Sequence, residues 1–326
     1  MITRRDLLNA SAAGVALSAT GFVPQGIAQP LARTVHIVTG FTPGLQDTMG
    51  RLIASQMKDY AETIVVETRP GAAGRVAAES VKSGAADGSI MLFGPLGFLT
   101  LFPHVHKTLP YKAEDFIPVT TAGAVPTLLT VGPKVPAEVK TLADFVAWCR
   151  ANPGQASFGT AGAGSTLHFI GAMLGRTERI EYLHVPYQGR GAIDDLLKGE
   201  IASAIMPLPS SFSLVQAGSL RALATTGTHR SPFLPDVPTM AEAGYPSLRD
   251  TTWSGFFVPA KTPAPVVEKL NGAIQAALRT DAVKSGMAKL GVEIDAISMN
   301  DLTRLIASES ERWKGIVQAT GFTPAG

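Results

Sequence analysis

The 326-residue sequence contains a single cysteine, Cys149, and only 17% of its residues are charged. One cysteine excludes a disulfide scaffold and a zinc site built from several thiolates. The 28 Lys and Arg nearly balance the 26 Asp and Glu, so the chain lacks the basic excess that nucleic-acid binding requires. Apolar residues make up 45%, which excludes a disordered chain, and the length is that of roughly two domains.

Long hydrophobic runs are also missing, and the longest uncharged run lies near the N-terminus. Arg4 and Arg5 precede an uncharged segment from Ala10 to Val23, and small residues follow up to Ala28. This segment of about 14 residues is shorter than the ~20 that span a bilayer, so residues 1–28 are predicted to be a cleaved signal peptide. The paired arginines favour twin-arginine export, with an ordinary Sec signal as the alternative. No cysteine follows Ala28, which excludes a lipoprotein anchor, and we expect a soluble periplasmic protein.

The remaining chain alternates β-rich runs with segments of helical spacing, which predicts α/β domains with parallel sheets. The predicted strands cover residues 35–39, 63–67, 89–93, 157–158, 182–185, 201–206 and 220–224. The predicted helices lie near residues 48–57, 76–82, 142–149, 193–198, 263–278 and 301–318. Thr141 and Asp144 form a capping-box pattern, Cys149 is interpreted as a core residue, and Gly199 as a helix C-cap.

Two glycine-containing loops follow predicted strands, one in each half of the chain. They cover residues 40–47 and 159–168. Turns of this kind that lead into helices present backbone N–H groups to an anion, and open α/β sheets bind ligands at the carboxyl ends of parallel strands. The two loops together imply a cleft between two domains, as in a periplasmic binding protein.

The second loop fits enzyme motifs poorly. A dinucleotide fingerprint requires a glycine where Leu167 stands and an acidic residue about 20 positions further on, and Glu181 is too near. Ser165 is not in a G-x-S-x-G elbow, and His168 three residues later is not sufficient for a triad. Carboxylate capture is favoured, with a periplasmic serine esterase or hydrolase using Ser165 as the alternative.

The six histidines are scattered, which argues against a metal site. His104 and His106 are predicted to share one side of a strand and to lie at the surface. His184 is interpreted as a group at the edge of the core. Asp194 and Asp195 are interpreted as a solvated helix face. No metal or other cofactor is expected.

Several motifs in constant order resemble the receptors of tripartite tricarboxylate transporters, the TctC-like or Bug solute receptors. These motifs are ETRPGAAG (67–74), ADG (86–88), LPY to DF (109–116), HVPYQG (184–189), AGSLRALA (217–224) and LPDVPTMAEAG (234–244). The last motif is long and distinctive, and the agreement extends through the whole mature chain.

The resemblance implies a periplasmic-binding-protein-like fold with two α/β domains around a central ligand cleft. The first would comprise residues 33–130 plus 254–326 and the second residues 131–253, with crossings near Val131 and Trp253. Members bind small carboxylates, often dicarboxylates, and pass them to a membrane permease without catalysis or a cofactor. We expect a monomer that binds no nucleic acid, and input to a sensor system is an alternative role.

The resemblance also implies the ligand-binding residues. They are Thr42, Gly44, Leu45, Gln46 and Asp47 in the first loop; Gly94, Pro95 and Leu96; Thr160, Ala161, Gly162, Ser165, Thr166 and His168; Tyr187; and Pro207.

The sequence departs from the family pattern around this site. Leu45 replaces the second glycine of a Pro-Gly-Gly motif, and the loop is one residue shorter. Leu96, Phe98 and Leu208 also stand where relatives carry small or polar residues, and the three loops of the site contain no Lys or Arg. We therefore expect backbone N–H groups to hold the carboxylate, in an apolar cleft that favours an aromatic or longer-chain ligand with one charge. If these side chains instead turn into the core, the expected ligand is an ordinary C4–C6 dicarboxylate.

Overall fold

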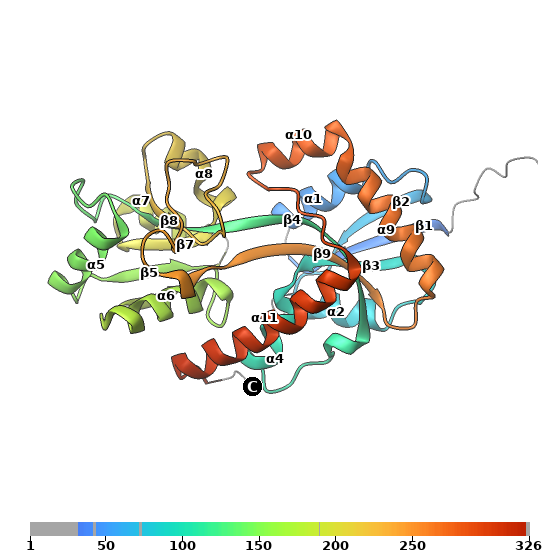
Figure 1. Ribbon diagram of the computed structural model, residues 1–326, viewed down its shortest axis with the longest axis horizontal. Helices are drawn as coiled ribbons and strands as arrows, with labels where there is room; N and C mark the ends of the chain where they lie inside the picture. The colour runs from blue at the N-terminus through green and yellow to red at the C-terminus, as the bar shows by residue number, and fades with distance from the viewer. Residues whose placement is uncertain (1–31, 42–43, 72–73, 189, 324–326) are drawn as a thin grey trace, which may run out of the picture. The chain divides into compact units, whose positions relative to one another are not determined.

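The computed structural model describes residues 32–41, 44–71, 74–188 and 190–323 (Figure 1). The predicted signal peptide, residues 1–28, lies outside these ranges. Within them, no helix has the length and apolar character needed to cross a membrane.

The first three strands form the predicted parallel β-α-β-α-β unit. Strand β1 (Ala32–Thr39) pairs in parallel with β2 (Ala61–Thr68) and with β3 (Ile90–Pro95), and helices α1 (Leu45–Ala54) and α2 (Arg75–Lys82) connect them. Strand β3 continues to Pro95, two residues beyond the end of the strand predicted over residues 89–93. A proline is tolerated there because it is the strand's last residue, where it lies opposite Ser254.

Two long strands that were not predicted run through the middle of the sheet. Strand β4 (Phe116–Val131) and strand β9 (Thr251–Pro259) pair with each other in antiparallel fashion, and the sheet order is β2-β1-β3-β9-β4-β7-β5-β6, with β8 also paired to β4 (Figure 1). The β4 residues are buried on both faces along most of the strand. Such a strand has no polar–apolar alternation for a sequence pattern to reveal.

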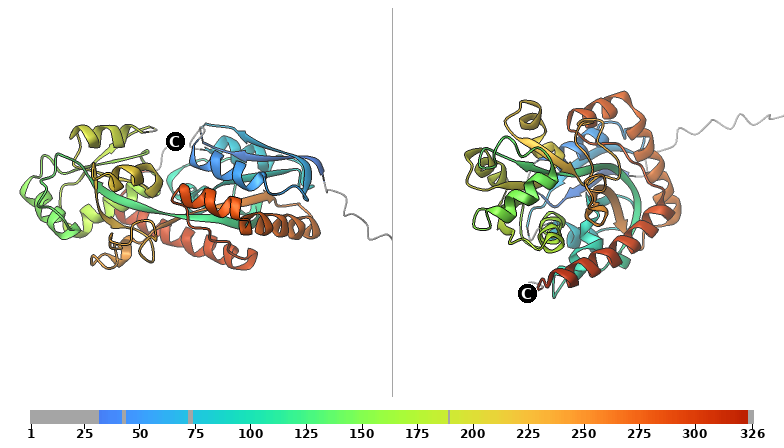
Figure 2. Two further views of the ribbon diagram at one scale, coloured as in Figure 1. Left: turned by 90° about the horizontal axis from the view of Figure 1, so that it is seen from above. Right: turned by 60° about the vertical axis from the view of Figure 1, so that its left-hand side comes forward.

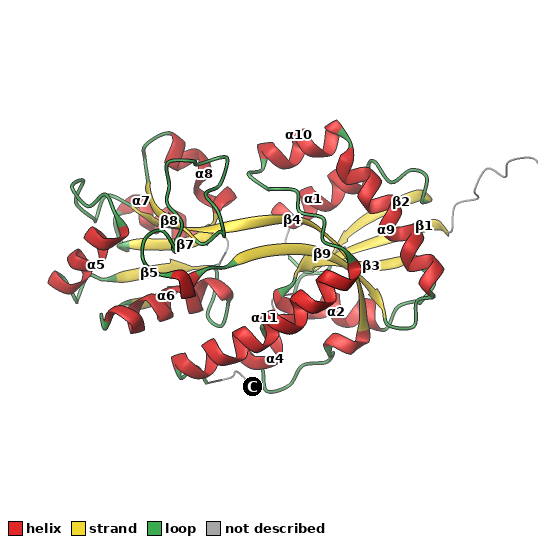
Figure 3. Cartoon of the chain, in the orientation of Figure 1, coloured by secondary structure: helices red, strands yellow, loops and turns green. Residues whose placement is uncertain are grey.

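The second half contributes four shorter strands with helices on both sides of them (Figure 3). These strands are β5 (Ser157–Thr160), β6 (Leu183–Pro186), β7 (Ser203–Pro207) and β8 (Arg221–Thr225). The helices are α5 (Leu142–Ala151), α6 (Thr166–Glu178), α7 (Gly191–Lys198) and α8 (Leu208–Gln216). The Thr141–Asp144 capping box at the start of α5 and the left-handed C-cap Gly199 after α7 are confirmed.

Further helices cover the sheet on the C-terminal side. The long ones are α9 (Ala264–Arg279), α10 (Asp281–Lys289) and α11 (Met299–Thr320). The short ones are α3 (Gly97–Thr100), α4 (Phe102–Val105) and the 3-10 turns η2 (Ala113–Asp115) and η3 (Pro246–Leu248). Helix α11 packs against α3, α4 and α6, so it contacts both halves of the chain (Figure 2).

The strand predicted for His104 and His106 is wrong. His104 lies in α4 and His106 caps it, because Pro103 suits the first turn of a helix. Both histidines are half-buried and not at the surface. His104 Nε2 lies 3.0 Å from Ser310 Oγ of α11.

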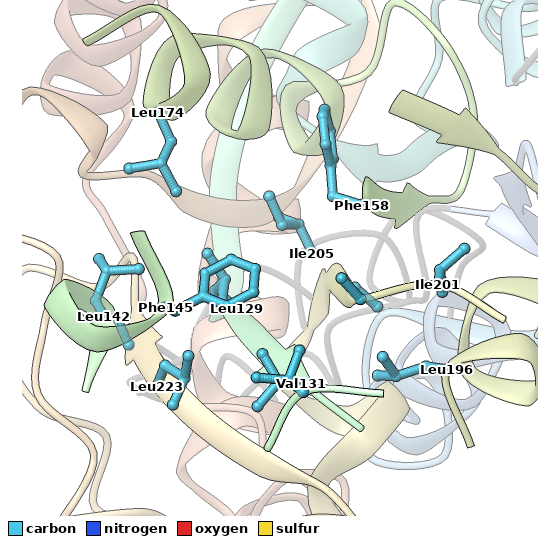
Figure 4. Close-up of a cluster of buried hydrophobic side chains, with 14 of the residues drawn as sticks. Leu129, Val131, Leu142, Phe145, Phe158, Leu174, Leu196, Ile201, Ile205 and Leu223 are labelled. Carbon is cyan, nitrogen blue, oxygen red and sulfur yellow. The ribbon is translucent and has the colours of Figure 1, made fainter. Parts of the chain in front are cut away.

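The largest cluster of buried side chains is drawn entirely from residues 129–248 (Figure 4). Phe145 and Phe158 lie in it, and Cys149 is a buried member, as predicted. Burial raises the pKa of the Cys149 thiol to about 12. A second cluster lies between strands β1–β3 and helices α1, α9 and α10. A smaller one joins Phe169 of α6 to Trp313 of α11.

Candidate functional site

A cavity of about 570 Å³ lies among loops from distant parts of the sequence. Its walls come from the start of α1, the segment from Pro95 through α4, the turn before α6, the end of β7, the start of β9, and α11 with Phe322 beyond it. This volume is typical of a site for a small organic molecule.

Most of the predicted site residues line this cavity. They are Leu45, Gln46, Pro95, Leu96, Ala161, Gly162, Ser165, Thr166 and Pro207. Gly44, Asp47, Gly94, Thr160, His168 and Tyr187 do not line it, and Thr42 lies outside the described residues.

The predicted residues that do not reach the cavity have other partners. Asp47 accepts hydrogen bonds from Arg51 Nε at 3.0 and 3.1 Å. The Tyr187 hydroxyl donates to Asp195 Oδ2 at 3.0 Å, so Asp195 is more than a solvated carboxylate. Thr160 and His168 hydrogen-bond to Gly162 and Gly164 of the cavity-lining turn, and the ring of His168 also packs against Phe322.

Two helices begin at the cavity wall. Helix α1 starts at Leu45, and its N-cap Gly44 provides no side-chain hydrogen bond. Helix α6 starts at Thr166, with Ser165 as its N-cap. The first N–H groups of a helix have no partner within the helix, and the helix dipole adds positive potential at this end. The cavity therefore receives N–H donors and positive potential from two directions.

Ser165 makes only local backbone contacts. Its Oγ accepts a hydrogen bond from the His168 backbone N–H at 3.2 Å and donates one to the Gly162 carbonyl at 2.8 Å. The imidazole of His168, three residues further along, has another partner, because its Nδ1 accepts a hydrogen bond from the Gly164 N–H at 3.3 Å. The serine is thus a helix cap and is not bonded to a base that could activate it.

Part of the cavity wall is aromatic. Phe41, Phe98, Phe102 and His106 all line the cavity and form a row in which successive ring centroids are 5.8, 5.6 and 5.3 Å apart. Burial, reinforced by the charge of Arg75, lowers the pKa of His106.

The leucines that depart from the family pattern do not behave alike. Leu45, Leu96 and Phe98 line the cavity, whereas Leu208 is buried in the core beneath β4. Leu96 and Phe98 are at the same time members of a buried hydrophobic cluster, 5% and 0% exposed, so the apolar ligand cleft stays a prediction.

The charged groups of the wall are acidic. Among the described lining residues there is no Lys or Arg, but Asp250 and Glu309 are present. Behind them Arg312 Nη2 lies 3.0 Å from Asp250 Oδ1 and 2.6 Å from Glu309 Oε2. Burial raises the pKa of the Asp250 carboxyl to about 6, and Arg312 opposes this shift. With both carboxyls ionised, the three groups carry one excess negative charge.

The sequence did not identify Asp250 and Glu309 as cavity residues. It also did not identify Trp253, Trp313 and Phe322, which lie in the cavity wall. Asp250 ends an irregular loop, and Glu309 and Trp313 lie on the helix predicted near residues 301–318, to which no site residue was assigned. No local motif marks them, because they meet the loops only through long-range packing. Within the described residues, no group of three or more His, Cys, Asp or Glu side chains could hold a metal ion.

The comparison of the sequence with known proteins and the comparison of the fold indicate the same protein family. The sequence model of the tripartite tricarboxylate transporter family receptors matches residues 49–322. The protein BugT of Bordetella pertussis is 35% identical over 312 residues, which cover 91% of this chain and 94% of BugT.

Solved structures with the same fold include R. palustris Rpa4515 with adipate, with 32% identity and a TM-score of 0.81 over 91% of this chain and all of that one. The periplasmic binding protein BugD has 26% identity and a TM-score of 0.77, with the same coverage of both chains. The α/β fold is thus that of a periplasmic binding protein, and the chain belongs to the tripartite tricarboxylate transporter family of receptors.

Proposed function

We propose that this protein is an extracytoplasmic receptor that captures a small organic carboxylate in the 570 Å³ cavity and delivers it to a membrane permease of the tripartite tricarboxylate type. Receptors of this family bind solutes and are not enzymes. The observation that carries the proposal is that helices α1 and α6, from opposite halves of the chain, both begin at this cavity.

The two helix N-termini supply what a carboxylate needs in a wall without Lys or Arg. Leu45 and Gln46 begin α1, Thr166 begins α6, and all three line the cavity. Each hydrogen bond to a charged oxygen contributes about 1.5–3 kcal/mol, so a few N–H donors supply a large part of the roughly 8 kcal/mol that micromolar binding requires.

The rest of the cavity supports a ligand with one carboxylate and an apolar body. The half-buried rings of Phe41, Phe102 and His106 offer aromatic surface to a ligand, and the excess negative charge of Asp250 and Glu309 opposes a second carboxylate. A like charge at ~8 Å costs about 2 kcal/mol at the effective dielectric of protein sites. The alternative is a dicarboxylate, since the similar structure Rpa4515 holds adipate.

Calorimetric titration with matched acids separates these ligands. Hexanoate and adipate share six carbons and differ by one carboxylate, and benzoate tests the aromatic wall. We expect hexanoate and benzoate to bind at least tenfold more tightly than adipate, and Glu309→Gln to narrow that ratio. Glu311→Gln, an exposed carboxylate of the same helix, is the control. Tighter binding of adipate by the wild type would refute the single-charge ligand and leave the receptor role intact.

We further infer that the two halves, residues 33–130 plus 254–326 and residues 131–253, close on the ligand. The antiparallel strands β4 and β9 both pass between the halves and would serve as the hinge. The pattern of residues 1–28 and the family's typical location support export to the periplasm. Mass spectrometry of the exported protein tests this, with a mature N-terminus near residue 29 expected.

The receptor role also implies that the chain catalyses no reaction. The contacts of Ser165 support this, because its Oγ bonds to backbone groups only. An assay with a chromogenic ester should show no turnover that Ser165→Ala removes. Serine-dependent turnover would favour the esterase alternative.

A further inference from the structure

The turn that precedes α6 rests on two stacked imidazoles. The ring centroids of His168, in α6, and His184, in β6, are 4.1 Å apart with an interplanar angle of 30°. Phe158 of β5 packs against both rings, at 6.4 and 4.9 Å, and Phe322 lies edge-on to His168 at 5.9 Å. Aromatic side chains from two other segments, β5 and the residues beyond α11, thus pack against the half-buried pair.

One imidazole is hydrogen-bonded to a residue within the turn and the other to the residue just before it. His168 Nδ1 accepts a hydrogen bond from the Gly164 N–H at 3.3 Å, and His184 Nε2 lies 2.8 Å from Thr160 Oγ1. The Thr160 hydroxyl in turn donates to the Gly162 carbonyl at 3.1 Å. Residues 161–166, which form this turn, line the cavity. The two histidines therefore fix the direction in which the first N–H groups of α6 point.

The hydrogen bond from Gly164 defines the charge that His168 can carry. A backbone amide can only donate, so His168 Nδ1 must hold a lone pair, and the ring's proton must be on Nε2. Protonation of Nδ1 would place two N–H donors against each other and break this contact. A second positive charge on the stacked ring would add repulsion at 4.1 Å.

Little around the pair would stabilise an imidazolium. The side chains packed on the rings from β5 and α6 and from beyond α11 are Phe158, Phe169 and Phe322. Among the described residues, the only charge that shifts either ring is the neighbouring imidazole. Burial lowers the pKa of His168, and burial together with His168 lowers the pKa of His184 to about 4. Both rings are therefore neutral at pH 7.

We propose that the stacked pair of His168 and His184 positions the cavity-lining turn for its ligand only while both rings are neutral, so that acidification releases the carboxylate. This inference rests on the proposed function and assigns to the two histidines a positioning role without ligand contact. Relative to a variant in which His168 cannot titrate, receptor occupancy would then fall when the surroundings become acidic, although the protein remains folded.

The first test compares wild type with two variants of His168. Asparagine can present an acceptor near the position of Nδ1 and does not titrate, whereas alanine removes the acceptor. Affinities for benzoate and for adipate are measured by calorimetry between pH 4.5 and 7.5. At pH 7.5 we expect His168→Asn to bind within about threefold of wild type and His168→Ala about tenfold more weakly.

The decisive quantity is the ratio of the wild-type affinity to that of His168→Asn at each pH. Protonation of the ligand cancels in this ratio, because both proteins meet the same ligand. We expect the ratio to fall at least tenfold as the pH drops from 7.5 to 4.5, with circular dichroism showing a folded protein throughout. His104→Asn is the control, because His104 is another half-buried histidine that faces α11. The proposal would be overturned if the affinities of wild type and His168→Asn changed with pH by the same factor.

A second measurement needs no ligand. Hydrogen exchange of the Gly164 amide, corrected for the intrinsic rate at each pH, should lose protection at pH 4.5 in wild type and keep it in His168→Asn. Unchanged protection in wild type would refute the positioning role. Failure of every carboxylate to bind at pH 7.5 would instead refute the proposed function, and the two failures are thereby distinguished.

Discussion

Ser165 and Thr166 are adjacent residues at the N-terminus of α6, and their hydroxyl groups have different roles. Ser165 caps α6 with its Oγ, so its hydroxyl is used within the protein. Thr166 lines the cavity as the first residue of α6, and within the described residues its hydroxyl has no hydrogen-bond partner. A ligand can therefore bond to the Thr166 hydroxyl without breaking a contact that stabilises the fold.

This difference predicts different effects of the two alanine variants. Ser165→Ala should lower the free energy of unfolding by about 1 kcal/mol, as for other lost N-caps, and weaken carboxylate binding about tenfold. Thr166→Ala should weaken binding by a similar factor but leave stability within ~0.5 kcal/mol. Urea denaturation and calorimetry of both variants provide the check. Wild-type affinity in both would show that the carboxylate is held elsewhere.

Asp250 gives stability an unusual dependence on pH. Its folded pKa of about 6 lies above the ordinary value of 3.8, so between these values the folded state binds more protons than the unfolded state. Its contribution to stability is thus fully present below pH 3.8 and is lost as pH rises through 6. Asn at this position cannot titrate.

Relative to Asp250→Asn, wild type should therefore gain on the order of 2 kcal/mol of unfolding free energy as the pH falls from 7.5 to 4. Urea denaturation of both proteins across this range measures the difference. A difference that shrinks toward low pH would mean that Arg312 dominates over burial and that the pKa of Asp250 is depressed.

At the scale of elements, short sequence motifs predicted those features of the fold that depend on contacts within a few residues. The capping box of Thr141 and Asp144 and the C-cap Gly199 located the ends of α5 and α7, because each acts within one helical turn. The glycine-rich turn before α6 likewise located one wall of the cavity. Strand β4 was missed because it is buried on both faces, and Glu309 and Phe322 because only tertiary packing brings them to the site.

The turn before α6 depends on a glycine with a left-handed backbone. Gly164 has φ +74°, and a Cβ there would lie 3.2 Å from the ring of Phe322. Gly164→Ala should therefore cost about 1–2 kcal/mol of stability and weaken carboxylate binding several-fold, because the turn must shift. Gly154→Ala, at an ordinary φ with open space around it, is the control. Equal effects of the two substitutions in urea denaturation and calorimetry would show that Gly164 is not strained.

At the scale of the whole molecule, the C-terminal helix joins the two halves of the chain from outside the sheet. The strands β4 and β9 connect them covalently, and α11 adds a packed contact against α6. Trp313 lies 6.2 Å from Phe169 and Phe322 5.3 Å from it, measured between ring centroids, and both Trp313 and Phe322 line the cavity. The same side chains thus close the cavity and hold the halves together.

Phe322→Ala should consequently affect ligand release more than folding. The half-buried ring follows the last helix, so its loss removes a contact between α11 and α6 but leaves both main hydrophobic clusters intact. We expect the dissociation rate of a bound carboxylate to rise three- to tenfold, followed by stopped-flow fluorescence of Trp253 and Trp313 in the cavity wall. Stability should fall by no more than about 1 kcal/mol, and Thr323→Ala, its exposed neighbour, should change neither quantity. Strong destabilisation by Phe322→Ala, with ligand release at the wild-type rate, would contradict this prediction. The Phe322 ring would then stabilise the fold without affecting ligand release, and the proposed closure would depend on β4 and β9 and not on α11.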